Sequence, residues 1–169
     1  MTRILAALTA LAVAVAALYW FQPWKLFTDA TVTEQLTATQ PEPSQSSEQA
    51  PQGPTVLARG DFVTHEHDTT GTATLVRDTD GSHRLELAGL ATSDGPDLRV
   101  WLTDQPVLPG EDGWHVFDDG EYLEAGRLKG NRGDQVYRLD PGVDVSDYRS
   151  VTIWCERFSV SFGAATLRR

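Results

Sequence analysis

The residue of this chain with the widest redox chemistry is its single cysteine. Cys155 is the only cysteine among 169 residues, and it lies in the apolar run from Ser150 to Gly163, which predicts a buried β-strand. Because the chain begins with a segment long enough to span a membrane, we expect Cys155 to lie outside the cytoplasm, where thiols normally form disulfides. With no partner in the chain, it is either an inert core residue or the centre of redox or ligand chemistry.

The apolar positions around Cys155 change parity along the run. Two alternating sets have opposite phase: Val151, Ile153 and Cys155, then Phe158, Val160 and Phe162. We expect both sets to face the core, with a β-bulge between Cys155 and Phe158 that reconciles them. Under this interpretation Cys155 points inward and Arg157 stays close to it. If Cys155 is functional, Arg157 or a bound metal should lower the pKa of the thiol.

Histidines form the second group with chemical potential. His65 and His67 could share one strand face and, with His83, His115 or Cys155, ligate a metal. A blue-copper centre would lack its usual axial methionine, since Met1 is the only one, and no C-x-x-C-H motif exists for covalent haem. The residues therefore favour exposed strand histidines and no metal site. Neither G-x-S-x-G nor a P-loop occurs, so a hydrolase or nucleotide-binding enzyme has no support.

The N-terminal segment predicts a membrane-associated helix, which would decide the compartment in which the domain with Cys155 lies. Residues 4–21 contain one polar side chain, Thr9, and form about 27 Å of helix at about 1.5 Å per residue, close to the thickness of a bilayer core. Aromatic residues and Lys25 follow, as at a membrane interface. We assign residues 1–28 to a single-pass anchor with the C-terminal domain extracytoplasmic. The alternative is a cleaved signal peptide and a secreted protein.

Residues 29–55 are rich in proline, glutamine and serine and nearly free of apolar side chains. Such a composition predicts a disordered linker, whose role would be to hold the folded domain clear of the membrane. Residues 56–169 then form one domain with twelve Lys and Arg against twenty Asp and Glu, a net charge of −8. The acidic balance excludes nucleic acid as a partner.

The domain is expected to be all-β, an antiparallel sandwich or small barrel. Thr72 to Val76 and His83 to Leu87 alternate in polarity around an Asp-Thr-Asp-Gly turn, which predicts a hairpin. Further short strands are separated by turn residues, and no window has apolar residues at helical spacing. The acidic stretch from Pro106 to Glu124 is expected to be a long loop or insertion.

Five motifs in order resemble the extracellular DM-thirteen domain over about residues 58–167. They are Gly60-x-Phe62, His67-x-x-x-Gly71-x-Ala73, Gly95-Pro96-Asp97-Leu98-x-Val100-x-Leu102, Leu128-Lys129-Gly130-x-x-Gly133-x-Gln135-x-Tyr137, and Val151-x-Ile153-Trp154-Cys155-x-x-Phe158-x-Val160-x-Phe162-Gly163-x-Ala165. The resemblance implies a β-rich fold and a proposed electron-transfer role, in which the family's nearly invariant cysteine corresponds to Cys155. It also implies a bare thiol or a bound group such as haem, and it adds His67 as a cofactor-binding candidate.

Together these observations predict a membrane-anchored redox carrier that acts through Cys155, with haem or copper as candidate cofactors and an unknown redox or envelope protein as partner. The alternative is a non-catalytic cell-envelope binding module in which Cys155 is simply packed in the core.

Overall fold

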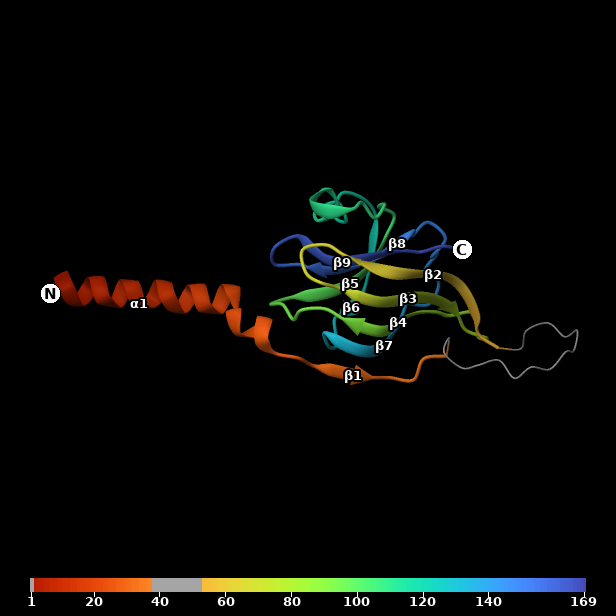
Figure 1. The fold of residues 1–169 in the computed structure, drawn as a ribbon, viewed down its shortest axis with the longest axis horizontal. Helices are drawn as coiled ribbons and strands as arrows, with labels where there is room; N and C mark the ends of the chain where they lie inside the picture. Colours follow the sequence, from red (N-terminus) through yellow and green to blue (C-terminus); the bar gives the residue numbers. More distant parts are fainter. Residues whose placement is uncertain (1, 38–52) are drawn as a thin grey trace, which may run out of the picture.

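The computed structural model describes residues 2–37 and 53–169, and its elements are a helix followed by a β domain (Figure 1). The elements, in chain order, are α1 (Thr2–Phe21), η1 (Pro23–Phe27), β1 (Thr31–Thr33), β2 (Thr55–Thr64), β3 (Thr70–Arg77), β4 (His83–Ala91), β5 (Leu98–Thr103), η2 (Gly110–Gly113), β6 (Tyr122–Arg127), β7 (Arg132–Arg138), β8 (Ser150–Cys155) and β9 (Val160–Thr166).

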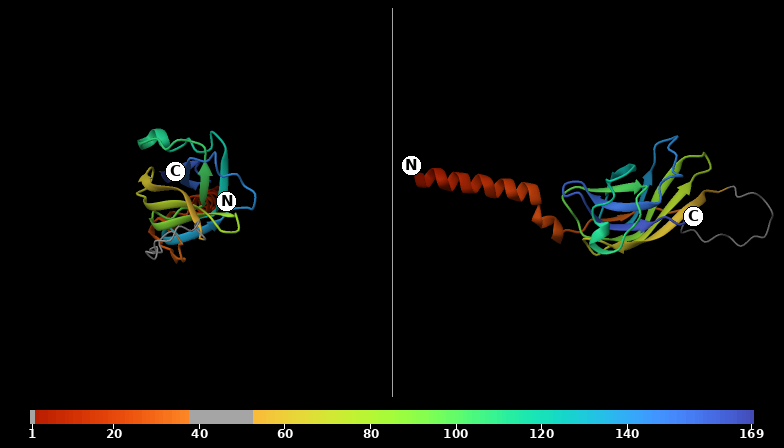
Figure 2. Two further views of the ribbon diagram at one scale, coloured as in Figure 1. Left: turned by 90° about the vertical axis from the view of Figure 1, so that its right-hand side faces the viewer. Right: turned by 90° about the horizontal axis from the view of Figure 1, so that it is seen from above.

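Helix α1 extends away from the domain with all of its residues exposed (Figure 2). It is long and apolar enough to cross a membrane, although a signal sequence near an N-terminus has the same length and composition. An apolar helix of this kind could anchor in a membrane.

The strands form one nine-stranded sheet in the order β1-β7-β4-β3-β2-β9-β8-β5-β6. All neighbours are antiparallel except β1 and β7, which are parallel. The sheet curls into a half-barrel around a core of aliphatic and aromatic side chains, as the end-on view shows (Figure 2). The predicted all-β domain is confirmed, and its architecture is the barrel-like one.

The hairpin predicted around the Asp-Thr-Asp-Gly turn is confirmed. Strands β3 and β4 pair antiparallel, with Thr74 opposite Glu86 and Leu75 opposite Leu85. Leu75 and Leu85 are fully buried in the inner core, so the polarity alternation of the sequence did report the faces of the two strands.

The prediction of one bulged strand from Ser150 to Gly163 is wrong. Strand β8 ends at Cys155, residues 156–159 form a tight turn, and β9 returns antiparallel from Val160. The inward direction predicted for Cys155 is confirmed, and Val160 and Phe162 also lie in the core. Phe158, however, sits in the turn and is 40% exposed, because it belongs to neither strand.

The acidic stretch covers the outer face of the sheet beside β8. Most of it is the predicted loop, with η2 in its middle, but its last residues, from Tyr122 on, pair with β5 as β6. Phe117, fully buried, packs with Trp101, Trp154 and Ala164 in a second small core. All six residues of β8 are consequently buried, since the barrel core covers one face and this loop covers the other.

The segment expected to be a linker from residue 29 is partly attached to the sheet. Thr31–Thr33 form β1 on the edge of β7, and the backbone N–H of Thr37 donates to the Glu86 carboxylate at 3.0 Å. The described chain resumes at residue 53, next to β2. Residues 38–52, on which most of the predicted linker falls, lie outside the described residues. Residues 22–37 contact the domain, and this is not the arrangement expected of a spacer that holds the domain clear of the membrane.

Candidate functional site

Cys155 is the last residue of β8, and the β8–β9 turn that follows lies at the end of the domain that faces α1 (Figure 1). Its side chain has no exposed surface and belongs to the inner core, in the same cluster as Leu98, Val160 and Phe162. Its backbone pairs with Leu98 of β5 on one side and Val160 of β9 on the other. The thiol is thus held in a central strand, directly before the β8–β9 turn.

Burial raises the pKa of the Cys155 thiol above its ordinary value, and this effect outweighs nearby backbone N–H groups, including those of Phe158 and Arg157, that lower it. A thiol of this kind stays protonated at neutral pH and reacts slowly, because the thiolate is the nucleophile. In this conformation Cys155 has the character of a packed apolar residue.

Arg157 stays near the thiol through its backbone N–H, but its guanidinium is engaged elsewhere. Its guanidinium points to the end of α1, where Nη1 donates to the backbone carbonyls of Tyr19 at 3.2 Å and Trp20 at 2.7 Å. These carbonyls lie in the last turn of the helix, where a cation is favoured by the helix dipole. The side chain therefore joins the β8–β9 turn to α1 instead of activating Cys155.

A pocket of about 300 Å³ lies where the end of α1 meets the domain, and we call it the helix-end pocket. Its helix side consists of Phe21, Gln22, Pro23 and Lys25. Its domain side consists of Glu66, His67, residues 94–96, Phe158 and Phe162. Three connections of the sheet, β2–β3, β4–β5 and β8–β9, thus converge on the helix end.

His67, the second site residue predicted from the sequence, lines this pocket. Its ring lies against Phe162, with ring centroids 3.9 Å apart, and its Nε2 is 3.6 Å from a carboxylate oxygen of Glu66. Phe162 also belongs to the core cluster of Cys155, so His67 packs against a residue of the core that contains the thiol. No direct contact joins His67 to Cys155 among the interactions of the described residues.

Lys25 places a positive charge at the same pocket. Its Nζ donates to the backbone carbonyl of Gly95 at 3.0 Å and lies 3.5 Å from Asp94 Oδ1. The Asp94 carboxylate also accepts a hydrogen bond from the Thr28 hydroxyl at 3.1 Å. Sequence reasoning used Lys25 only as a sign of membrane orientation. Its partner lies 69 residues away in the chain, so spacing carried no signal of this contact.

A second network fixes the segment after η1 to the domain. The buried Asn131 accepts a hydrogen bond from the backbone N–H of Ala30 at 2.7 Å and donates to Asp29 Oδ1 at 2.8 Å. Gly133, with a φ of +97°, lets β1 approach, because a Cβ there would fall 2.0 Å from the carbonyl oxygen of Val32. Gly130 and Gly133 of the family motif thus form a surface that receives the N-terminal segment.

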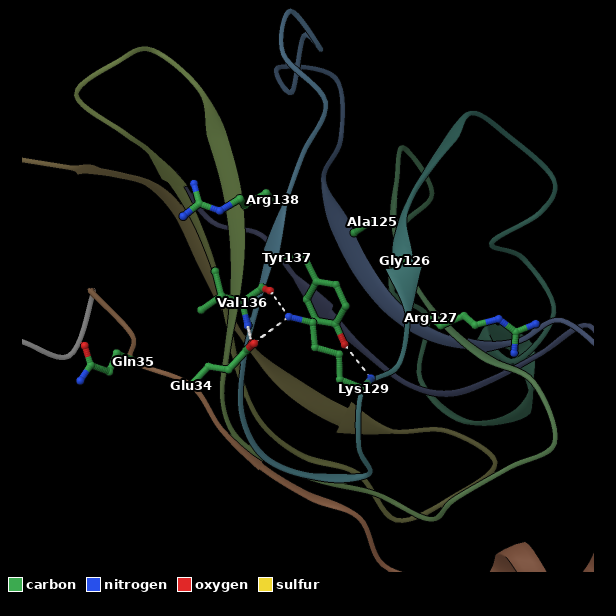
Figure 3. Close-up of a pocket in the computed structure, with 9 residues that line it drawn as sticks. All are labelled: Glu34, Gln35, Ala125, Gly126, Arg127, Lys129, Val136, Tyr137 and Arg138. Carbon is green, nitrogen blue, oxygen red and sulfur yellow. Dashed lines mark hydrogen bonds and ion pairs between the residues drawn. The ribbon is translucent and has the colours of Figure 1, made fainter.

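A cavity of about 580 Å³ opens where the two ends of the curled sheet approach each other, between β6 and β7 (Figure 3). Lys129 crosses it: its Nζ binds the Glu34 carboxylate at 2.9 Å and the Val136 carbonyl at 2.6 Å, while Glu34 accepts the Val136 N–H at 2.6 Å. These bonds hold the pKa of Glu34 below its usual range. Burial raises the pKa of Tyr137 to about 12. This cavity is lined by neither Cys155 nor His67, and Lys129, Glu34 and the Val136 backbone satisfy one another within it.

The other histidines do not assemble with His67. His65, expected to be exposed, is 5% exposed; its Nδ1 is 2.8 Å from the Ser161 hydroxyl and its Nε2 is 3.1 Å from the Leu108 carbonyl. Burial lowers the pKa of His65. His115 Nδ1 lies 2.6 Å from the Ser159 carbonyl. Both histidines bind loop backbone or a hydroxyl group.

The residues present do not fit a haem or copper centre. The Cys155 sulfur is enclosed in the core, and within residues 2–37 and 53–169 no three His, Cys, Asp or Glu side chains gather in a group that could hold a metal ion. An axial thiolate would require the β8–β9 turn to move first.

The fold and the site define a half-barrel β domain with one enclosed thiol, joined directly to an apolar helix. The family model described as electron transfer DM13 matches residues 61–167, and the chain belongs to this family. The resemblance seen in the sequence motifs is thereby confirmed, and the domain is an electron-transfer-related module. Comparison with curated proteins and with solved structures found no match.

Proposed function

We propose that this protein is a membrane-anchored, extracytoplasmic electron-transfer module in which α1 crosses the membrane and Cys155 is the redox group. The observation that carries the proposal is the place of Cys155: the family's cysteine stands at the end of the domain that meets α1, directly before the turn bound to the helix. Electrons exchanged there would pass close to the membrane surface.

A lone thiol needs a second group to carry electrons. If Cys155 and a thiol of a partner protein join in a disulfide, two electrons and two protons leave the pair, and an electron acceptor on the partner must receive those electrons. Cys155 must become exposed for this step, and the cover over it is the β8–β9 turn. Ser159 in that turn has a φ of +48°, a conformation that costs a non-glycine residue some backbone strain. The turn is therefore the element that we expect to move.

The second candidate function is that of a non-catalytic envelope module. It is favoured by one specific observation, the complete burial of Cys155 together with the raised pKa of its thiol. In this function the cysteine only fills the core, as free cysteines commonly do.

Thiol–disulfide exchange of the full-length protein with glutathione disulfide, measured by intact mass, distinguishes the two functions. A mixed disulfide that forms in the folded native protein, is absent in Cys155→Ala and is retained in Val160→Ala supports the thiol as redox group. Val160 is the matched control, because it is a buried neighbour of Cys155 in the same cluster without redox chemistry. A mixed disulfide that forms only after the whole domain unfolds contradicts the redox role.

The membrane topology is tested separately. We expect a C-terminal epitope to be digested by protease added to intact cells, and the mature protein to retain residues 1–28 when its mass is measured. A protected epitope contradicts the proposed orientation, and a mass that lacks the N-terminal helix establishes secretion after cleavage.

A further inference from the structure

The helix-end pocket has the chemistry of a small-molecule site. Ligand pockets usually occupy about 300–1,000 Å³ and combine apolar walls with a few polar groups that set the orientation of the ligand. This pocket, at about 300 Å³, is at the small end of that range. It would hold one substituted ring, and a macrocycle would not fit.

The walls of the pocket are flat and apolar. Phe21 of α1 and Phe158 of the β8–β9 turn stack with ring centroids 5.8 Å apart and planes 19° apart. Phe162, Pro23 and Pro96 complete the apolar lining. Aromatic and proline rings arranged in this way offer faces on which a planar ligand can stack.

Two side chains at the pocket can donate hydrogen bonds to such a ligand. Lys25 carries an ammonium with three donors, and the contacts with Gly95 and Asp94 leave capacity for one more. His67 is held by its ring contact with Phe162, and its imidazole is partly exposed. Both groups donate to neutral oxygen acceptors, so the lining matches a ring that carries carbonyl oxygens on its edge.

The position of the pocket specifies how the ligand arrives. One wall consists of the last residue of α1, Gln22, and two residues of η1, Pro23 and Lys25, so in a bilayer the pocket lies at the level where lipid tails end. Trp20, Trp24 and Phe27 are more than half exposed around it, as expected for an interfacial belt. A ligand with an apolar tail could place its head group in the pocket while its tail stays in the bilayer.

We propose that the helix-end pocket binds the ring of a lipid-soluble quinone, with its carbonyl oxygens accepting hydrogen bonds from Lys25 and His67 and its tail remaining in the bilayer. This inference rests on the proposed function, because it requires α1 to lie in the membrane. It concerns binding alone. It would give an electron-transfer module a site for a membrane-borne redox molecule against Phe162, which belongs to the same core cluster as Cys155.

The test uses the full-length protein in phosphatidylcholine nanodiscs, titrated with a decyl-substituted benzoquinone while tryptophan fluorescence is recorded. We expect saturable quenching, with apparent affinity lowered about tenfold by His67→Leu and by Lys25→Met, since each removes one hydrogen bond to the ligand. His83→Leu is the matched control, because His83 lies on β4 outside the pocket, and its affinity should stay within about twofold of the native value. His67→Gln keeps a donor and should retain more affinity than His67→Leu.

Three results would overturn the proposal. They are non-saturable quenching, equal affinity in His67→Leu and His83→Leu, and displacement of the quinone by decanol, which has the tail without the ring. The proposed function and this inference fail separately. Mixed-disulfide formation at Cys155 in the folded protein without quinone binding refutes only the site, and saturable quinone binding without such a mixed disulfide refutes only the thiol role.

Discussion

The guanidinium of Arg157 caps the end of α1 at Trp20, with Nη1 2.7 Å from the Trp20 carbonyl oxygen and the guanidinium carbon 5.3 Å from the centre of the indole ring. Arg157 lies two residues after Cys155, so this contact ties the cover of the thiol to the helix. The stacking of Phe21 on Phe158 adds a second tie at the same turn. The domain is therefore held at the helix end by contacts with residues before 38, in addition to the covalent connection through the chain.

This arrangement predicts that cutting the chain between residues 38 and 52 will not release the domain. The contacts of Lys25, Asp29 and β1 with the domain should keep residues 53–169 bound to the membrane fraction after cleavage at a specific protease site introduced there. The measurement is the distribution of the C-terminal fragment between pellet and supernatant.

The matched variant for this experiment is Asn131→Ala combined with Arg157→Ala, which removes the hydrogen bonds to Asp29, Ala30 and the helix end. We expect the cleaved fragment of this variant to move to the supernatant. Quantitative release of the native fragment immediately after cleavage would show that these contacts do not hold in the membrane.

A second prediction concerns access to Cys155. Because its thiol is buried and its pKa is raised, the native protein should react with a maleimide reagent at pH 7 far more slowly than the unfolded chain. Labelling then reports opening of the β8–β9 turn. Arg157→Ala should accelerate it about three- to tenfold, since one exposed charged hydrogen-bonding group is lost.

The control for this measurement is Arg77→Ala, which removes an exposed arginine at the end of β3, remote from the turn. Its labelling rate should equal that of the native protein. Equal rates in Arg157→Ala and native protein would mean that labelling requires unfolding of the whole domain.

A third prediction concerns the outer core. Trp154 is 1% exposed and packs between Trp101, with ring centroids 5.1 Å apart, and Phe117. Trp154→Ala should lower the free energy of unfolding by about 3–5 kcal/mol, as other losses of buried aromatic rings do. Denaturant titration of the full-length protein measures it, with the half-exposed Trp24→Ala as control, whose change should stay below about 0.5 kcal/mol. A loss near that of the control would mean that the loop does not cover this face.

The elements that could be predicted from the sequence are those that have a recognisable local residue pattern. The alternation in β3 and β4 and the turn between them gave the correct hairpin, because each strand has one apolar face and the turn contains glycine. The β8–β9 turn was missed for the corresponding reason. Its residues, Glu156 to Ser159, include no glycine, proline or asparagine, and Ser159 takes the left-handed conformation that those residues usually mark.

The contacts that build the helix-end pocket could not be predicted, because they join positions far apart in the chain. Lys25 pairs with Asp94, and Phe21 stacks on Phe158, and neither pair has a spacing that a strand or helix imposes. His67 was predicted as a site residue only because it belongs to a motif of the family. The burial of His65 depends on the acidic loop returning over β9, which no local pattern indicates.

The contact between the buried His65 and the acidic loop predicts that the stability of the domain depends on pH. Burial lowers the pKa of His65 in the folded protein below the value of about 6.5 for an unfolded chain. The unfolded state then binds more protons between the two values, so the free energy of unfolding should fall as the pH drops below about 6.5 and level off below the folded pKa. Protonation also makes both ring nitrogens donors, and a charged ring in this buried site has no carboxylate among its hydrogen-bond partners, the Ser161 hydroxyl and the Leu108 carbonyl. Urea titrations at pH 7 and pH 5 measure the difference in unfolding free energy, which His65→Gln should reduce and His83→Gln should leave in place. An unchanged difference in His65→Gln would assign the pH dependence to other groups.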